Sequence, residues 1–306
     1  MRIVLIGQAA FGESVFKKLI ERGHEVVGVA APATKEGARP DPLRATAEAA
    51  GVPVLETRRL RRPEVFEQFA ALKPDLNVMA FVTDIIRENV LTLPKLGTIQ
   101  YHPSLLPRHR GIASINWAII QGDKKTGLTI FWVDEGIDTG PILLQKEVDV
   151  GPDDTVGSIY FNKLFPLGVE AMVEAIDLVR DGKAPQIIQD ESQATYEPPC
   201  TEEHTQIDWS APADTTYNLI RGSNPQPGAV TSFNGQELKI FDVQRVVDGA
   251  TGAPGTVLSV GDDGVAVAMT AGAVRLLRVT PEGGTKTSAT DWARQAGVRQ
   301  GSRLGS

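Results

Sequence analysis

Strand-like and helix-like segments alternate along the first two hundred residues, and this alternation restricts the possible folds of the chain more than any other feature. Residues 3–6 and 25–30 are rich in apolar and β-branched side chains and are predicted to form strands, whereas residues 11–21 show a helical period. Residues 76–81 form an apolar run without alternation, which is typical of a strand covered on both faces. The pattern therefore predicts an α/β fold with a mostly parallel, Rossmann-like sheet and helices on both of its faces.

Further elements continue this order as far as residue 200. The remaining strands are predicted at residues 53–55, 97–101, 127–133 and 142–150, and the remaining helices at residues 43–50 and 63–72. Asp153, Asp154 and Thr155 are suited to cap the start of a long helix that reaches about residue 179. Pro166 lies inside that helix and is expected to bend it, because proline cannot donate a backbone hydrogen bond.

The chain changes character at about residue 201, where closely spaced strands replace the alternation. Five short strands are predicted at residues 228–233, 237–243, 255–260, 265–269 and 273–279, with helices at residues 212–221 and 288–295. Asn234-Gly235 favours a tight hairpin turn, because both residues tolerate a positive φ. We therefore expect two domains: an α/β domain at residues 1–200 and a small, OB-like β-barrel at residues 201–306.

Composition narrows the classes of function. The 306 residues include 31 Lys and Arg against 38 Asp and Glu, a formal net charge of −7, so the chain has no overall attraction for nucleic acid or an anionic membrane. No apolar stretch approaches the roughly twenty residues that a membrane-spanning helix needs, and the apolar run at the N-terminus is too short for a secretory signal. Cys200 is the single cysteine and cannot form an internal disulfide, which agrees with a reducing compartment. We expect a cytoplasmic protein that does not bind membranes.

Motifs for a dinucleotide or a metal are incomplete. Gly7 and Gly12 follow the first strand and precede a helix, but their spacing does not match the dinucleotide fingerprint. No acidic residue ends the second strand, where a ribose hydroxyl would need a partner. The acidic loop at residues 134–140 lacks the spacing of a calcium-binding loop, and no His/Cys cluster has the spacing of a zinc site. The glycines are therefore predicted to form a tight turn beside a cleft, and no metal is expected.

Two short loops carry the strongest candidates for chemistry. His102 follows a predicted strand in a proline-stiffened loop, and Asp138 lies in the glycine-flanked loop 134–140. Ligands of open α/β sheets bind beyond the carboxyl ends of the strands, and a histidine paired with a carboxylate is suited to general acid–base catalysis. A histidine that only fastens its loop and an aspartate that only caps a turn are the structural alternatives. Arg108 and Arg110 flank the predicted cleft and are candidates for contact with an anion.

These two loops resemble those of the folate-dependent formyltransferases. The resemblance rests on His102-Pro103-Ser104-Leu105-Leu106-Pro107 and on the loop 134–140, with 36 residues from His102 to Asp138. It extends over essentially the whole chain, including residues 194–196, 207–209 and 301–304. The family includes methionyl-tRNA formyltransferase, the sugar-amine formyltransferases and the hydrolase domain of 10-formyltetrahydrofolate dehydrogenase. Residues 101–138 look closest to that hydrolase domain.

The resemblance implies that residues 1–200 form the catalytic domain of an enzyme of one-carbon metabolism, with 10-formyltetrahydrofolate as the formyl donor. It implies that His102 and Asp138 act on the formyl group, with Gln100 as a third catalytic residue. The folate would be held by residues of three segments: Phe81, Asp84, Ile85 and Ile86; Ser104, Leu105, Leu106 and Pro107; and Val133, Asp134 and Gly136.

Gln100 departs from the family pattern, which has an asparagine two residues before the histidine. Glutamine keeps the carboxamide donor but adds one methylene, so its amide must curl back to reach the same point. The hydrolase domain also lacks the asparagine. An inactive folate-binding module is therefore an alternative from another class, although His102 and Asp138 at the family spacing argue against it.

The resemblance leaves three acceptors for the formyl group. A small amine, such as an amino sugar, is favoured, because no dehydrogenase domain accompanies this chain and free hydrolysis would waste the donor. Water is the next candidate, since the most similar segment belongs to a hydrolase domain. Methionyl-tRNA is disfavoured, because residues 201–306 carry 11 acidic and 9 Lys or Arg residues, whereas a domain that grips RNA should be basic. The sequence does not indicate which amine, which pathway or which oligomeric state applies.

Overall fold

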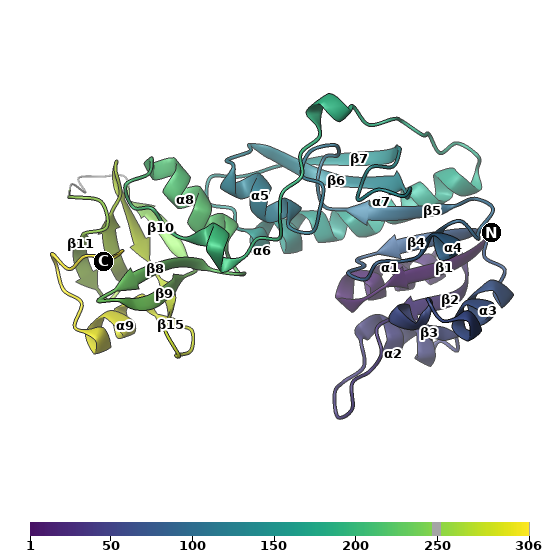
Figure 1. The fold of residues 1–306 in the computed structure, drawn as a ribbon, viewed down its shortest axis with the longest axis horizontal. Coiled ribbons are helices and arrows are strands. Elements are labelled where there is room, and N and C mark those ends of the chain that lie inside the picture. The colour runs from purple at the N-terminus through teal and green to yellow at the C-terminus, as the bar shows by residue number, and fades with distance from the viewer. Residues whose placement is uncertain (247–251, 306) are drawn as a thin grey trace. The chain divides into compact units, whose positions relative to one another are not determined.

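The computed structural model describes residues 1–246 and 252–305, which divide into two compact units (Figure 1). Unit 1 comprises Met1–Arg110, Gly127–Val148 and Asn162–Tyr196. Unit 2 comprises Gly111–Thr126, Asp149–Phe161 and Glu197–Ser306. The units are interleaved in sequence, because two segments from the first two hundred residues belong to unit 2. The functional domains expected at residues 1–200 and 201–306 stay a prediction.

Unit 1 is built on a seven-stranded sheet with the order β3-β2-β1-β4-β5-β6-β7. Its strands are β1 (Arg2–Gly7), β2 (Glu25–Ala31), β3 (Val54–Glu56), β4 (Leu76–Ala80), β5 (Thr98–His102), β6 (Lys125–Trp132) and β7 (Ile142–Asp149). The first five strands in this order are parallel to their neighbours, whereas β6 runs antiparallel to β5. The predicted, mostly parallel sheet is therefore confirmed.

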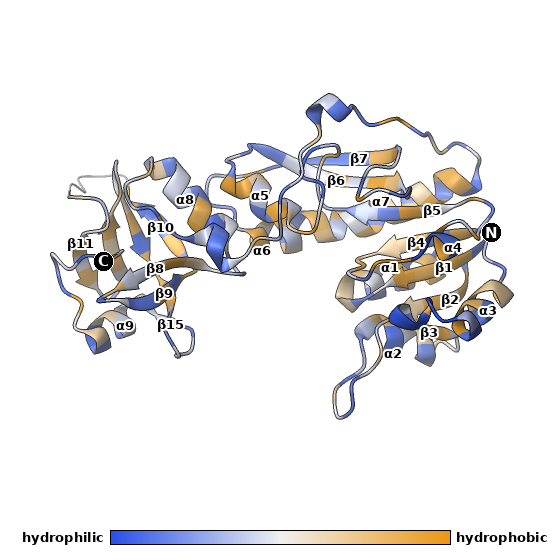
Figure 2. Cartoon of the chain, in the orientation of Figure 1, coloured by the Kyte–Doolittle hydropathy of each residue, from blue (hydrophilic) through white to orange (hydrophobic). Residues whose placement is uncertain are grey.

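Both faces of this sheet are covered, as the unalternating apolar strands predict. The helices are α1 (Ala9–Glu21), α2 (Pro42–Ala49), α3 (Pro63–Ala71), α4 (Glu88–Leu91) and α7 (Phe165–Arg180). Val4 and Ile6 of β1 pack with Phe69 of α3 in one apolar cluster. Ile3 and Leu5 point to the opposite face, because side chains alternate along a strand, and they too are fully buried. Strand β1 is accordingly orange over most of its length in Figure 2. In the described part of the chain, every helix is too short or too polar to cross a membrane.

The long helix predicted after Thr155 is present but interrupted. The Thr155 hydroxyl accepts a hydrogen bond from Ser158 N (3.1 Å) and the Ser158 hydroxyl accepts one from Thr155 N (2.9 Å), which forms a capping box at the start of α6 (Val156–Ile159). A π-helical segment, Tyr160–Leu164, then leads into α7. Pro166 lies in the first turn of α7, where it needs no hydrogen-bond donor, so the predicted distortion precedes the proline.

The β-rich part of unit 2 forms two four-stranded sheets, with the orders β10-β13-β12-β11 and β15-β14-β9-β8. The strands are β8 (Ala229–Phe233), β9 (Gln236–Ile240), β10 (Val243–Val246), β11 (Val257–Gly261), β12 (Gly264–Ala268), β13 (Ala273–Leu276), β14 (Arg278–Pro281) and β15 (Thr287–Ser288). Neighbouring strands in both sheets pair antiparallel, which confirms the small antiparallel β domain. The two sheets share one core, to which Leu238 and Val267 both contribute.

The prediction of five strands was wrong, because two predicted strands each divide between the sheets and the short strand β15 was not predicted. The run 237–243 leaves one sheet at Phe241 and enters the other at Val243. The run 273–279 changes sheet at Leu277. The Asp242 carbonyl joins the two crossings, since it accepts hydrogen bonds from Leu277 N (2.8 Å) and Arg278 N (3.3 Å). In each run two consecutive apolar residues, Ile240-Phe241 and Leu276-Leu277, interrupt the alternation at the change of sheet.

Gly168 allows α7 to approach α1 closely, and we expect Gly168→Ala to destabilise unit 1. A Cβ atom at this position would lie 2.7 Å from Tyr101 Cε2 and 3.0 Å from Phe11 Cε2. This overpacking should lower the free energy of unfolding by about 1–3 kcal/mol, despite the higher helix propensity of alanine. Chemical denaturation measures the change. Gly157→Ala is the control. Its Cβ atom would lie 3.5 Å from the nearest atom, Pro225 Cδ, so the substitution should have little effect. Equal stability of the two variants would contradict close packing at Gly168.

Candidate active site

His102 is the last residue of β5, and its ring is held by the loop that follows. Because β1, β4 and β5 are parallel, His102 lies at the same edge of the sheet as Gly7 and Ala80, the final residues of the other two strands. The residue is only 5% exposed. Its Nε2 donates a hydrogen bond to the carbonyl oxygen of His109 at 2.8 Å. The orientation of the imidazole therefore depends on where the loop places His109.

Hydrogen bonds of Thr129 on the neighbouring strand and of Ser104 within the loop stabilise this loop. The Thr129 hydroxyl of β6 donates to Ser104 O (2.7 Å) and accepts from Leu106 N (3.1 Å). The Ser104 hydroxyl donates to Arg108 O at 2.7 Å. His109 has a φ of 56°, so the chain turns sharply at the residue whose carbonyl accepts the hydrogen bond from the His102 ring.

Asp138 reaches the histidine from the opposite end of β5. Because β6 is antiparallel to β5, the loop after β6 begins beside the first residue of β5, where Val133 N donates to Thr98 O (2.9 Å). The loop then folds back along the sheet. Its turn is closed by Asp134 Oδ1, which accepts from Gly136 N (3.0 Å) and from the Thr139 hydroxyl (2.6 Å).

Two positions in the Asp138 loop require unusual backbone geometry. A Cβ atom on Gly136 would overlap the side chain of Thr139, and one on Gly140 would overlap the carbonyl of Trp132. Asp138 itself has a φ of 56° and is only 8% exposed. The glycines noticed in the sequence are therefore required for the loop to fold back and bury this carboxylate.

The structure brings the side chains of His102 and Asp138 together. His102 Nδ1 lies 3.5 Å from Asp138 Oδ2, which is an ion-pair contact somewhat longer than an ordinary hydrogen bond. Nε2 must carry a hydrogen, because its partner is a carbonyl oxygen that can only accept. The contact between Nδ1 and the carboxylate is then favourable only when one of these two atoms also holds a proton. The geometry is thus suited to a proton shared between the two side chains.

Gln189 links the loops of the two catalytic candidates. Its Nε2 donates to Asp138 O (2.9 Å) and Gly140 O (2.7 Å). Its Oε1 accepts from Arg110 Nε (3.2 Å) and Nη2 (2.8 Å). Gln189 is buried, and all four hydrogen-bonding positions of its amide are used. Ile187, two residues earlier, exchanges two backbone hydrogen bonds with Ile142 at the start of β7, which sets the position of the glutamine.

Arg110 is fully buried and completes this network from the His102 loop. Its guanidinium bonds both carboxylate oxygens of Glu191 (2.6 and 3.0 Å) and also donates to the Tyr196 hydroxyl. The hydrogen bonds to Glu191 raise the pKa of Arg110 above its ordinary value, so it remains a cation. The suggestion that Arg110 contacts an external anion needs correction, because its carboxylate partner belongs to the chain itself. Arg108, by contrast, is exposed.

Gln100 lies two residues before His102 on β5, so both side chains project from the same face of the sheet. Within residues 1–246 and 252–305, its amide makes no hydrogen bond. The amide is therefore available to a ligand beside the His102 ring. Its catalytic role stays a prediction.

The predicted folate-binding residues form the surroundings of this pair. Phe81, directly after β4, has a φ of 59° and is 42% exposed, and Ile85 is 99% exposed. Asp84 forms an ion pair with Arg58 at 2.9 Å. Ile86 packs with Val133 in the apolar cluster beneath this loop.

Val133 also belongs to the cluster that contains Leu106, so the three predicted segments meet at this residue. The remaining residues of the predicted set are Ser104, Leu105, Pro107, Asp134 and Gly136, of which Ser104 is fully buried. The binding role of the whole set stays a prediction.

Sequence reasoning missed Gln189 and Thr129, the two side chains that position the loops. Gln189 is 51 residues from Asp138 and lies in an irregular segment. Thr129 lies within a predicted strand, where a threonine is unremarkable. Neither residue carries a local signal of its role.

Comparison with known proteins gives a consistent result. Residues 1–176 match the protein-family model described as "Formyl transferase", and residues 199–297 match "Formyl transferase, C-terminal domain". The cytosolic 10-formyltetrahydrofolate dehydrogenase of Xenopus tropicalis is 47% identical over 254 residues, which cover 81% of this chain but only 28% of that protein. The methionyl-tRNA formyltransferase of Bacillus velezensis is 38% identical over 310 residues and covers 99% of this chain and 98% of its own.

A solved structure shares the fold. HypX from Aquifex aeolicus, crystallised in complex with tetrahydrofolic acid, has a TM-score of 0.71 and covers 96% of this chain and 47% of its own. At 23% identity, this likeness supports the fold alone.

Gln189 offers a test of the link between the loops. In Gln189→Glu, one carboxylate oxygen would face the carbonyls of Asp138 and Gly140 and could no longer donate to them. We expect the free energy of unfolding to fall by about 1–3 kcal/mol at neutral pH, and the NMR signals of the His102 ring to shift or broaden. Gln295→Glu is the control, because it makes the same charge change on the exposed side of α9 (Ala289–Ala296). Unchanged His102 signals in Gln189→Glu would show that Gln189 does not position the pair.

Proposed function

The chain belongs to the formyl transferase family, and from this premise we propose that it removes the formyl group of 10-formyltetrahydrofolate at the His102–Asp138 pair. The observation that carries the proposal is the contact of His102 Nδ1 with Asp138 Oδ2 at 3.5 Å, in a buried position and with Nε2 fixed by His109 O. The names of relatives at 46–48% identity support the donor, since they are 10-formyltetrahydrofolate dehydrogenases. The chain spans 26–28% of the length of these relatives, so their complete activity is not carried over.

The proposed reaction needs one proton acceptor and one proton donor. A nucleophile attacks the formyl carbon and passes its proton to the pair. The formyl carbon thereby becomes tetrahedral and its oxygen becomes an oxyanion. The pair returns a proton to N10 of the folate as the bond between carbon and N10 breaks. When the nucleophile is water, the products are formate and tetrahydrofolate, and no covalent intermediate with the protein forms.

The developing oxyanion requires stabilisation, which the residues of β5 are placed to provide. A protonated His102 ring places positive charge beside the reacting carbon. The Gln100 amide projects from the same face and is free to donate to the oxyanion. A single such donor typically lowers the barrier by about 3 kcal/mol. Gln100 would then take the place of the asparagine of the family pattern.

The folate would lie over the loops that surround the pair. The exposed side chains of Phe81 and Ile85 are suited to cover an aromatic ring system, since they present apolar surface to solvent. Ligand sites of this kind combine apolar walls with a few polar groups that fix orientation. Backbone groups of residues 104–107 and 133–136 are proposed to supply the polar contacts.

We place water first among the acceptors. The relatives at 46–48% identity are enzymes of 10-formyltetrahydrofolate, and residues 101–138 resemble the hydrolase domain of that enzyme. The small amine expected from the sequence stays an alternative prediction. A cytoplasmic location also stays a proposal, since the relatives include proteins named as cytosolic and as mitochondrial.

Transfer to methionyl-tRNA is the second candidate function. The full-length match to the Bacillus velezensis enzyme favours it, because the match covers both proteins almost completely. The charge of residues 201–306, with 11 acidic and 9 Lys or Arg residues, opposes it.

An acceptor-resolved assay separates these functions. Tetrahydrofolate release from 10-formyltetrahydrofolate is followed by absorbance with no added acceptor, with a panel of amino sugars and other small amines, and with methionyl-tRNA. We expect release without an added acceptor, with one formate formed per tetrahydrofolate. Release that requires an amine or the charged tRNA would reject water as the acceptor. If no acceptor supports release while tetrahydrofolate still binds, the chain is a binding module and the proposed function is wrong.

Substitution of the pair tests the mechanism. His102→Ala and Asp138→Asn should each lower kcat at least about 10³-fold, because either change removes the shared proton site. Tetrahydrofolate affinity should change less than about threefold.

Gln100→Leu should lower kcat about 10²-fold, as expected for one lost oxyanion donor. Leu93→Ala, at an exposed position outside the predicted site, is the control. Near-normal turnover in Asp138→Asn would contradict the proposed role of the pair.

A further inference from the structure

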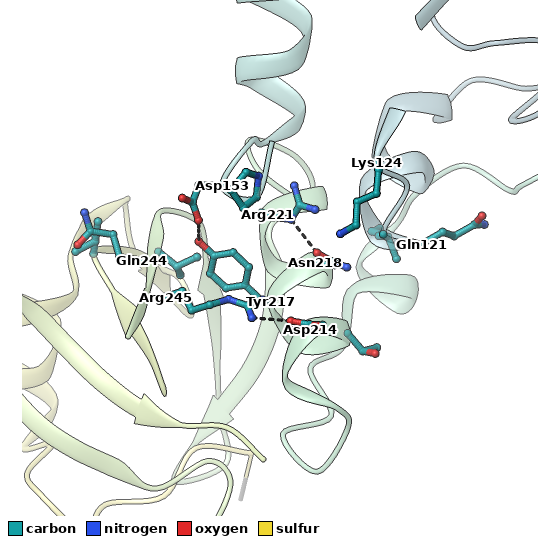
Figure 3. Close-up of a pocket in the computed structure, with 15 residues that line it drawn as sticks. Gln121, Lys124, Asp153, Asp214, Tyr217, Asn218, Arg221, Gln244 and Arg245 are labelled. Atoms are coloured by element: carbon teal, nitrogen blue, oxygen red, sulfur yellow. Dashed lines mark hydrogen bonds and ion pairs between the residues drawn. The ribbon is translucent and has the colours of Figure 1, made fainter. Parts of the chain in front are cut away.

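Unit 2 contains a cavity of about 1040 Å³ that shares no residue with the His102–Asp138 site (Figure 3). Its walls come from the end of α5 (Ser114–Ile120) and the turn after it, from residues 152–153, from α8 (Ala213–Gly222) and from β10. All of these segments belong to the same unit. The cavity is large enough for a small organic ligand rather than for an ion alone.

Arg221 of α8 is a buried cation that lacks a carboxylate partner. It is only 3% exposed, and its Nε donates to Asn218 Oδ1 at 2.9 Å. Its Nη1 donates to the backbone carbonyls of Gly151 (3.1 Å) and Asp154 (2.8 Å). In the described part of the chain, no carboxylate lies within ion-pair distance of the guanidinium, since Asp154 and Asp153 act on it only through longer-range electrostatics, and Nη2 has no acceptor. A buried charge normally has a counter-ion, so the open Nη2 edge indicates a place for an anion.

Two further donors line the same cavity without an acceptor. Asn218 Oδ1 accepts the hydrogen bond from Arg221 Nε, and the Asn218 Nδ2 group remains as a donor without an acceptor among the described residues. Lys124 is exposed, and its ammonium forms no hydrogen bond or ion pair with any residue in 1–246 and 252–305. Figure 3 shows the Lys124 side chain directed toward Asn218, with Arg221 on the neighbouring turn of the helix. Three donors of different type therefore converge on one region.

The two carboxylates of the cavity wall are already engaged. Asp153 accepts a hydrogen bond from the Tyr217 hydroxyl at 2.8 Å. Burial and this bond raise the pKa of Tyr217 to about 12, so the hydroxyl remains a donor to Asp153 at neutral pH. Asp214 forms an ion pair with Arg245 at 2.6 Å, and Arg245 also stacks over the Tyr217 ring, 4.5 Å from its centre. Three cations against two carboxylates leave the wall with one excess positive charge.

We propose that Lys124, Asn218 and Arg221 bind the phosphate group of a small phosphorylated molecule. A phosphate group has several strong acceptor oxygens and matches a guanidinium, an ammonium and an amide donor together. The cavity is much larger than phosphate, so the rest of the ligand fits beside it. The amide of Gln244 in the wall is suited to a hydroxyl group, whereas Gln121 already donates to Glu197 (3.2 Å), so a sugar phosphate is favoured.

Binding to the full-length chain tests this site without reference to formyl transfer. Isothermal titration calorimetry in phosphate-free, low-salt buffer compares ribose 5-phosphate, ribose and inorganic phosphate. We expect ribose 5-phosphate to bind with a Kd below about 1 mM, at least threefold more tightly than inorganic phosphate, and ribose not to bind. Higher salt should weaken the binding. No binding of ribose 5-phosphate up to 10 mM, or equal binding of inorganic phosphate, would overturn the proposal.

Matched variants locate the binding. Asn218→Asp keeps the acceptor for Arg221 Nε but places negative charge where the phosphate would lie, and it should weaken binding at least tenfold. Lys124→Gln should weaken it about fivefold. Asn234→Asp, in an exposed hairpin turn, and Lys35→Gln, in an exposed loop, make the same charge changes elsewhere and should leave binding unchanged. Full binding by Asn218→Asp, or equal losses in the two exposed controls, would refute the site.

Discussion

The hydrogen bonds of the Gln189 amide are the interaction on which the proposed active site most depends. The His102 loop follows β5, whereas the Asp138 loop leaves β6 beside the opposite end of β5, so sheet geometry alone does not bring the two side chains together. The amide holds the Asp138 loop through two carbonyls and is itself held by Arg110, at the end of the His102 loop. A carboxamide is suited to this position because it offers two donors and two acceptor sites within one rigid group. Replacing it by an acid or a hydrocarbon would leave buried carbonyls without partners.

The acid–base character of the pair follows from the same constraints. The loop from Ser104 to Arg110 fixes His109 O, and this carbonyl determines which nitrogen of His102 carries hydrogen. The remaining nitrogen then faces a buried carboxylate, and the contact is favourable only with a proton between them. Burial excludes water that would otherwise screen the interaction. A site of this kind is suited to the proposed formyl transfer without a covalent intermediate, and surfaces beyond the pair would then select the acceptor.

Much of this arrangement was accessible from the sequence because its causes are local. Apolar runs such as residues 76–80 report burial on both faces, and Thr155 and Ser158 form a helix cap within four residues. Gly136 and Gly140 occupy positions where a side chain would overlap neighbouring atoms, so their spacing carries information about the loop. The new strand partners in unit 2 were not accessible. Two consecutive apolar residues, Ile240-Phe241 and Leu276-Leu277, interrupt the alternation where each predicted strand divides. The change of partner, however, depends on hydrogen bonds between segments about 35 residues apart.

By itself, the sequence determined the α/β class, the antiparallel β domain, the family and the pair His102 and Asp138, because each of these rests on local pattern or on a motif of fixed spacing. Only the tertiary structure decided that β6 turns antiparallel, that Arg110 faces inward to Gln189 and Glu191, and that Arg221 is buried without a carboxylate partner in the described chain. Hydrogen bonds of Arg110 and Arg221 join residues 70 to 81 positions apart, and any polar side chain of suitable reach could take part in them. The identity of such a residue therefore does not reveal its partner; the partner is set by which segments the packed core brings within hydrogen-bonding distance.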